Sequence, residues 1–179
     1  MNYVYGVLVI ITLSSLIYIY NTNVQKCVKD VHTFCVMKDS DETKIKVLKE
    51  ISVRYDKLVS YLEKKHKNDE ITKNILKRYS TNSVFKESLG EKYIAYTKNK
   101  GSAISFCLKE YDINTLMFVA LHELAHIATD EIGHTYKYWE NFRFLLRCAE
   151  KIKIYKNVDY SKYPVTICDS EIKRNPIYG

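Results

Sequence analysis

The stretch from Leu116 to Ile127 constrains the fold of this chain more than any other. Its sequence, LMFVALHELAHI, is an apolar run interrupted only by two histidines and a glutamate. Residues four apart share one face of an α-helix, so His122 and His126 can present both imidazoles to one metal ion, with Glu123 beside them. Burying three ionisable side chains is costly unless each has a partner or a metal. The pattern therefore predicts a buried metal-binding helix; the alternative is a core helix with hydrogen-bonded histidines.

Length and composition indicate a single folded domain rather than a disordered chain. The chain has 179 residues, of which 46% are hydrophobic and 27% charged, enough to build one core. The net charge of +7 is spread along the sequence without a long basic block. Diffuse positive charge favours acidic partners in general, but the sequence contains no recognised DNA- or RNA-binding signature. A nucleic-acid partner is therefore not indicated.

The N-terminal segment is predicted to be a membrane anchor. The sequence from Tyr3 to Tyr20 contains no charged residue and, as a helix, would span about 27 Å, close to the hydrocarbon thickness of a bilayer. No basic residue precedes it and no small-x-small cleavage site follows, which favours an uncleaved transmembrane helix within residues 1–22 over a cleaved signal peptide or a buried element. Because lysines follow the segment, the positive-inside rule predicts a single-pass membrane protein with its domain on the cytoplasmic side.

Residues 23–39 are predicted to form a juxtamembrane linker, and residues 40–179 a metallopeptidase-like domain. His32 stands alone in this linker and is expected to be solvated. The five cysteines are Cys27, Cys35, Cys107, Cys148 and Cys168. Their odd number and spacing indicate neither a zinc ribbon nor a disulfide framework and fit a reducing compartment, although a Cys27–Cys35 pair stays open if the domain faces an oxidising side.

The remaining pattern predicts an α+β fold, mostly helical, with a small β-hairpin or sheet. Apolar spacing indicates a helix over about 41–65 and a second helix capped by Asp69, followed by short irregular or helical structure over Ser80–Gly90. Two β-prone runs, 93–97 and 102–108, flank a turn-like tetrad and predict a hairpin. Such a hairpin can serve as a substrate edge for strand addition, or it can be purely structural.

A catalytic zinc site needs a third protein ligand and an open position for water. Downstream candidates are Asp130, Glu131, His134, Glu140 and Glu150. Gly133 can break the helix and turn the chain, which would bring His134 back toward the metal. We therefore favour His134, with Glu140 as the main alternative.

The histidine motif and the sequence that follows resemble a known family. ALHELAHI followed by GHTYKYWENFRFLL, a Gly-His pair leading into an aromatic helix, resembles the WLM-type and SprT-type minimal zinc metallopeptidases, and above all the compact versions carried by large DNA viruses. The resemblance covers roughly residues 90–170. It implies that His122, His126 and His134 bind one Zn²⁺ ion and that Glu123 is the catalytic base. The downstream zinc ribbon of many SprT-type proteins is absent.

Motif and resemblance together predict a membrane-anchored, zinc-dependent metallopeptidase that hydrolyses peptide bonds in a protein or peptide substrate. Glu123 would act as the general base on a zinc-activated water. Tyr136 and Tyr163 are possible oxyanion donors by residue type alone. The alternative is a non-catalytic, membrane-tethered interaction protein with a structural or vestigial zinc site.

Overall fold

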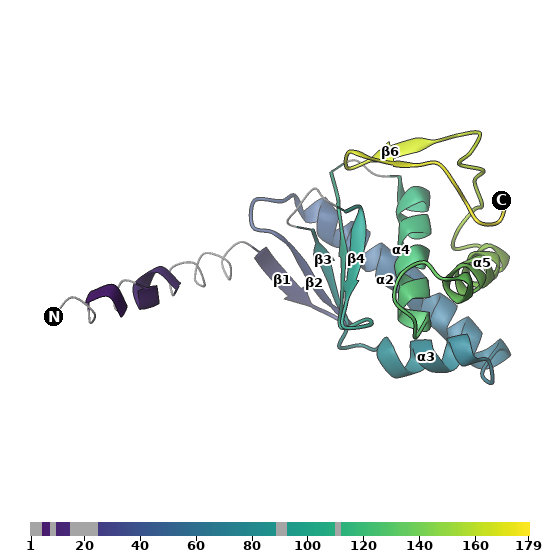
Figure 1. Ribbon diagram of the computed structural model, residues 1–179, viewed down its shortest axis with the longest axis horizontal. Coiled ribbons are helices and arrows are strands. Elements are labelled where there is room, and N and C mark those ends of the chain that lie inside the picture. Colours follow the sequence, from purple (N-terminus) through teal and green to yellow (C-terminus); the bar gives the residue numbers. More distant parts are fainter. Residues whose placement is uncertain (1–4, 8–9, 15–24, 89–92, 110–111) are drawn as a thin grey trace.

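A mixed five-stranded sheet lies against a layer of helices, and a short two-stranded hairpin closes one end (Figure 1). The computed structural model describes residues 5–7, 10–14, 25–88, 93–109 and 112–179. The sheet contains β1 (Gln25–Lys29), β2 (Thr33–Met37), β3 (Val84–Glu87), β4 (Ala95–Lys98) and β5 (Ala103–Phe106), and the hairpin is β6 (Val165–Ile167) with β7 (Ser170–Ile172). The helices are α2 (Glu42–Lys65), α3 (Glu70–Arg78), α4 (Ile113–Ala128) and α5 (Tyr136–Lys151). The predicted α+β class is confirmed, but the sheet is larger than the expected hairpin.

The strand order is β1-β2-β3-β5-β4. The central pairs, β2 with β3 and β3 with β5, are parallel, and the outer pairs, β1 with β2 and β4 with β5, are antiparallel. The predicted hairpin is therefore confirmed as β4–β5, and its turn contains positive φ angles at Asn99, Lys100 and Gly101. Among the described strands, β4 pairs only with β5 and is therefore an edge strand, and it lies beside α4.

Helix α4 is the central helix of the domain. It is capped at its N-terminus by Asp112, whose side chain accepts a 2.8 Å hydrogen bond from the backbone N–H of Thr115. It is apolar around almost its whole circumference, as expected of a helix buried on all sides, and it contacts α2, α3, α5 and β4 (Figure 1). Tyr55 of α2 is fully buried and donates its hydroxyl to the carbonyl of Ala120. The predicted metal-binding helix is thus the core of the structure.

The expected linker and the expected irregular segment both contribute strands. The prediction of a linker over residues 23–39 was wrong for 25–37, which form β1 and β2, and the segment after α3 contains the central strand β3. Phe34 and Phe85 from these strands are buried in the core. Strand β2 pairs with β3, about fifty residues away, as between Phe34 and Phe85, and local periodicity does not reveal that pairing.

His32 is buried rather than solvated. It is 1% exposed, and its Nε2 lies 3.2 Å from both carboxylate oxygens of Asp56 and 3.1 Å from the hydroxyl of Tyr79. The expectation of a solvated histidine was wrong because the tight β1–β2 connection turns the side chain inward, against α2 and the chain after α3.

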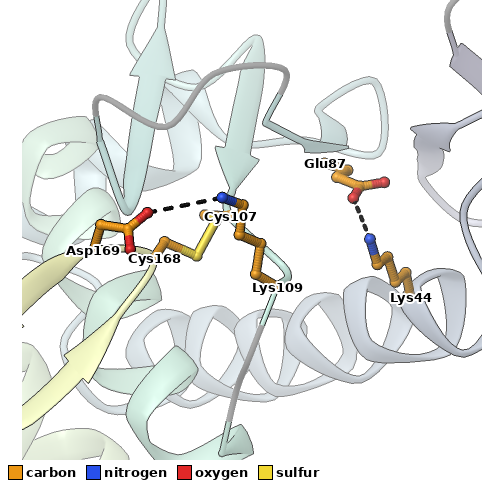
Figure 2. The surroundings of a disulfide bond; sticks show 6 residues. All are labelled: Lys44, Glu87, Cys107, Lys109, Cys168 and Asp169. Atoms are coloured by element: carbon orange, nitrogen blue, oxygen red, sulfur yellow. Dashed lines mark hydrogen bonds and ion pairs between the residues drawn. A yellow bond between two sulfur atoms is a disulfide. The ribbon is translucent and has the colours of Figure 1, made fainter.

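Two disulfides are formed. Cys27–Cys35 joins β1 to β2, and Cys107–Cys168 joins the end of β5 to the turn between β6 and β7 (Figure 2). Cys148 is a buried free thiol. The expectation that the cysteines form no disulfide framework was wrong. The second pair spans 61 residues and is brought together only by tertiary structure.

The predicted transmembrane segment falls largely outside the described residues. Of Tyr3 to Tyr20, only residues 5–7 and 10–14 are described, and these are helical. Within the described parts of the chain, no helix combines the length and hydropathy required to cross a bilayer.

Candidate metal centre

Three histidines converge beside the end of α4. His122 and His126 project from the helix, and His134 comes from the loop that follows it. Their potential ligand nitrogens all lie within 4.8 Å of one another, and no other metal-ligating group of this size occurs among the described residues. The Nε2 atoms of His122 and His134 are 3.2 Å apart.

This spacing fits a tetrahedral metal ion. With Zn–N bonds of about 2.0–2.1 Å, two imidazole nitrogens of a tetrahedral site lie about 3.3 Å apart, close to the 3.2 Å between His122 and His134. A metal ion would also accept a lone pair from each ring, whereas a direct hydrogen bond requires one nitrogen to be protonated. Three protein ligands leave one coordination position free, which is the arrangement of a catalytic rather than a structural zinc site.

The electrostatic environment keeps the helix histidines in the form that binds metal. Burial, reinforced by the two neighbouring histidines, lowers the pKa of His122 to about 3. Burial, together with His134 and Lys100, lowers the pKa of His126 to about 4. At neutral pH both rings are therefore neutral and offer a nitrogen lone pair to a cation.

Glu123 lies next to the histidines with a strongly perturbed carboxyl group. The residue is 5% exposed, and burial raises its pKa to about 7, although a hydrogen bond from Thr97 opposes that rise. The Thr97 hydroxyl Oγ1 donates to Glu123 Oε2 at 2.8 Å. A carboxylate with a pKa near neutrality both accepts and releases protons under ordinary conditions, as a general base requires.

Side chains from α3 fix the point at which α4 ends. The last carbonyls of a helix have no intrahelical partner. Here Arg78 Nη1 donates to the carbonyl of Ile127 at 2.7 Å, and Asn74 Nδ2 donates to that of Ala128 at 3.0 Å. These bonds terminate the helix two residues after the second motif histidine, His126.

Lys100 then holds the loop that returns to the metal site. Its ammonium donates to three consecutive carbonyls from Thr129 to Glu131, at 2.6, 3.1 and 3.2 Å. Gly133 adopts a φ of +86°, in the left-handed region that glycine occupies without strain. The predicted turn is therefore present, and it directs His134 back onto the face of α4 that carries the other two histidines.

Aromatic side chains of α5 cover the histidine rings. The ring of Tyr138, fully buried, lies 4.4 Å from that of His126 and nearly parallel to it, with 31° between their planes. Trp139, which is 36% exposed, lies 5.5 Å from the His134 ring. Packing of this kind restricts the ring orientations and preorganises the three nitrogens.

A cavity of about 530 Å³ opens above the metal site. It is bounded by the edge strand and its turn, by the motif residues of α4 and by the loop after α4. Its lining residues are Tyr93, Ala95, Tyr96, Thr97, Asn99, Lys100, His122, Glu123, His126, Glu131, Ile132, Gly133 and His134. An extended peptide placed along β4 would therefore pass directly over the three histidines and Glu123.

The structure brings together four residues predicted from sequence to form the site: His122, Glu123, His126 and His134. The other candidates lie outside the histidine group. His134 completes the histidine group, whereas Glu140 is exposed on α5 and outside it. Tyr136 and Tyr163 are 75% and 69% exposed, and neither lines the cavity over the metal site. Their role as oxyanion donors stays a prediction.

Sequence reasoning missed Thr97 and Lys100. Thr97 orients the glutamate, and Lys100 orients the loop of the third histidine. The only sequence signal was the predicted hairpin that contains them, and a hairpin alone does not show which of its side chains reach another element.

Comparison with solved structures identifies the fold. A crystal structure of a Wss1 mutant from Saccharomyces cerevisiae superposes with a TM-score of 0.50 over 66% of this chain and 89% of that one, at 19% identity. The chain has the fold of Wss1. A second Wss1 structure gives a TM-score of 0.49 over 66% of this chain and 88% of that one, at 20% identity. The expected resemblance is thus confirmed as similarity to the fold of Wss1, and the three histidines of this chain that it implied as metal ligands lie together.

Sequence relatives come from large DNA viruses, and no family model matches the chain. The uncharacterized protein R325 of Acanthamoeba polyphaga mimivirus is 40% identical over 43% of this chain and 42% of its own length. The uncharacterized protein 136R of Invertebrate iridescent virus 6 is 41% identical over 34% of this chain and 38% of its own length. The matched segments therefore span less than half of these relatives, whose names assign no activity.

Proposed function

We propose that this protein is a zinc-dependent metallopeptidase that hydrolyses peptide bonds in protein or peptide substrates. The observation that carries the proposal is the convergence of His122, His126 and His134, with their ligand nitrogens within 4.8 Å, beside the buried Glu123. The Wss1-like fold supports it at the level of architecture.

Each group in the site has a defined task in peptide hydrolysis. A Zn²⁺ ion, when bound by the three histidines, supplies a Lewis acid that acidifies water and polarises the scissile carbonyl. Glu123 accepts the proton of the attacking water on its carboxylate and delivers it to the leaving amine. Thr97 holds one oxygen of that carboxylate. The edge strand β4 offers free backbone groups to an extended substrate, as in recognition by strand addition.

The proposal is tested by pairing metal analysis with a cleavage assay. The purified protein should contain about one zinc per chain and should cleave denatured protein or peptide mixtures. Glu123→Gln should retain zinc and lose turnover by at least about a thousandfold, since base catalysis and water positioning are lost together. Glu140→Gln, an exposed carboxylate on α5, is the matched control and should cleave normally. Normal proteolysis by Glu123→Gln would refute the assignment.

The competing function is a non-catalytic interaction protein whose zinc is structural or whose motif is vestigial. A structural zinc site has four protein ligands, whereas the described residues provide three, beside an open cavity. Zinc binding without cleavage of any peptide by the unmodified protein would favour this alternative.

Membrane attachment through residues 3–20 is part of the proposal on sequence grounds alone. The lysines that follow favour a cytoplasmic domain by the positive-inside rule. The two disulfides are instead typical of an oxidising compartment. Alkaline extraction of membranes from expressing cells tests the anchor, and protease protection of the sealed membranes tests the orientation; release by alkali would refute the anchor.

A further inference from the structure

A second cavity adjoins the metal site on the side facing α5. It has a volume of about 480 Å³ and shares His122, Glu123, Tyr93 and Ala95 with the first cavity. The two cavities therefore meet at the catalytic glutamate, and a substrate lying along β4 would reach the second one with a side chain next to the scissile bond.

The walls of this second cavity are largely apolar, with a basic end. From α4 come Phe118 and Val119, one helical turn before the motif, and from α5 come Trp139 and Phe142. A further wall is the segment 170–174, which comprises β7 and the two residues that follow it. Aromatic and aliphatic walls favour a large apolar side chain, because its transfer out of water is favourable.

The basic end is provided by Lys173 and Arg174, both exposed. Lys173 forms a 2.9 Å ion pair with Glu171, which partly neutralises it. The net positive charge at this end favours an acidic substrate residue beyond the apolar one.

The β6–β7 wall is held in place covalently. The disulfide Cys107–Cys168 connects its turn to the residue that follows β5, the strand paired with β4 (Figure 2). Beside the disulfide, Lys109 lies 3.8 Å from Asp169 in an ion pair. The strand that would bind the substrate backbone is thus paired with β5, and the disulfide joins the end of β5 to the wall that would contact the substrate side chain.

We propose that the cavity between α4, α5 and the β6–β7 hairpin is a specificity subsite. It takes a large apolar side chain adjacent to the scissile bond and, through Arg174 and Lys173, favours an acidic residue next to it. This inference rests on the proposed peptidase activity and assigns its substrate class.

The test is a cleavage profile of the full-length zinc-loaded protein on a random peptide library, with cleavage sites identified by mass spectrometry. Ser170→Phe fills the cavity from the hairpin without altering α4. Its matched control is Thr166→Phe, an exposed position on the same hairpin that does not line the cavity. Lys173→Glu with Arg174→Glu reverses the charge of the basic end, and the exposed Arg147→Glu on α5 is the control for charge.

We expect enrichment of Phe, Leu, Met or Tyr at one position flanking the cleaved bond and of Asp or Glu at its neighbour. Ser170→Phe should lower kcat/KM about tenfold or more for the apolar substrate relative to its Ala analogue. The charge reversal should replace the acidic preference by a basic one, while both controls keep the original profile. An unchanged profile in Ser170→Phe, or uniform cleavage by the unmodified protein, overturns the subsite.

Binding separates failure of the subsite from failure of the peptidase proposal. Peptides with Phe or Ala at the flanking position are titrated against Glu123→Gln, and Ser170→Phe is introduced into that background. Preferential binding of the Phe peptide that disappears with Ser170→Phe supports the subsite even if the unmodified protein cleaves nothing. Equal binding of both peptides overturns it even if the unmodified protein is an active peptidase.

Discussion

Thr97 Oγ1 donates a 2.8 Å hydrogen bond to Glu123 Oε2 and so links the edge strand of the sheet to the motif of the metal helix. Strand β4 is thereby more than a candidate surface for substrate. It also fixes one oxygen of Glu123, the buried carboxylate among the described residues that line the cavity over the metal site.

Replacing Thr97 by Val should shift the pH dependence of catalysis. The hydrogen bond lowers the pKa of Glu123, which burial raises to about 7. A base must be ionised, so activity is present above this pKa and lost below it. Removing a bond to a charged group costs about 1.5–3 kcal/mol, so the acid limb of kcat/KM should move to higher pH by about one to two units.

Thr97→Ser retains the hydroxyl and is the matched control for this shift. It should keep the acid limb of the unmodified protein, measured as kcat/KM from pH 5 to 9 at saturating zinc. An identical limb in Thr97→Val would show that the hydrogen bond does not tune the base.

Replacing Lys100 by Met should weaken metal binding without unfolding the protein. Lys100 donates to the carbonyls from Thr129 to Glu131 and so holds the loop that carries His134. Residues that orient metal ligands typically contribute 10–100-fold to affinity, and we expect a zinc Kd weaker by about that factor in competition with a chromophoric chelator. Lys98→Met, an exposed lysine of the same turn, should bind zinc normally. Equal affinity in both variants would contradict this role.

The sequence was sufficient to predict that the three histidines lie together because the features that place them are local. His122, Glu123 and His126 lie within two turns of one helix, so their common face follows from helical geometry alone. His134 required only a break after the helix, which Gly133 supplied. The same reasoning identified α2 and α3, whose apolar residues recur at helical spacing, and the aromatic helix expected after His134 is α5.

What the sequence did not reveal depends on contacts between distant segments. Strands β1, β2 and β3 are short, and the pairing of β2 with β3 is set across a long separation, as in Phe34 opposite Phe85. Cys107 and Cys168 meet because the C-terminal hairpin folds back beside β5. Spacing in the sequence carries no information about either event.

The metal-free protein should lose stability as the pH falls below about 6.5. The pKa values of His122 and His126 are about 3 and 4 in the folded state, below the ordinary 6.5, so the unfolded chain binds more protons between about pH 6.5 and 4. The free energy of unfolding therefore decreases with decreasing pH across that window. Because His126 is partly exposed, solvent screening reduces its contribution to the pH dependence of the free energy of unfolding.

Protonation of Glu123 opposes the loss of stability at low pH, so a variant at this position is the control. Its folded pKa of about 7 lies above the ordinary 4.5, so the folded state binds the extra proton between about pH 4.5 and 7. Glu123→Gln removes that opposition and should steepen the pH dependence of unfolding by up to about 1.4 kcal/mol per pH unit. Urea denaturation in the presence of a chelator, from pH 4.5 to 7, measures both slopes. A slope unchanged by Glu123→Gln would show that this carboxyl group is not perturbed by burial.

The two disulfides should differ in their contribution to stability because they close loops of different length. Cys27 and Cys35 are 8 residues apart, and Cys107 and Cys168 are 61 apart. By loop-closure entropy, removing the first pair should cost about 2.5 kcal/mol and removing the second about 4 kcal/mol. Paired Cys→Ser variants, compared by denaturant unfolding, test this order, and mass spectrometry after alkylation under denaturing, non-reducing conditions should show a single modified thiol, Cys148. Five modified thiols without reductant would mean that neither bond forms.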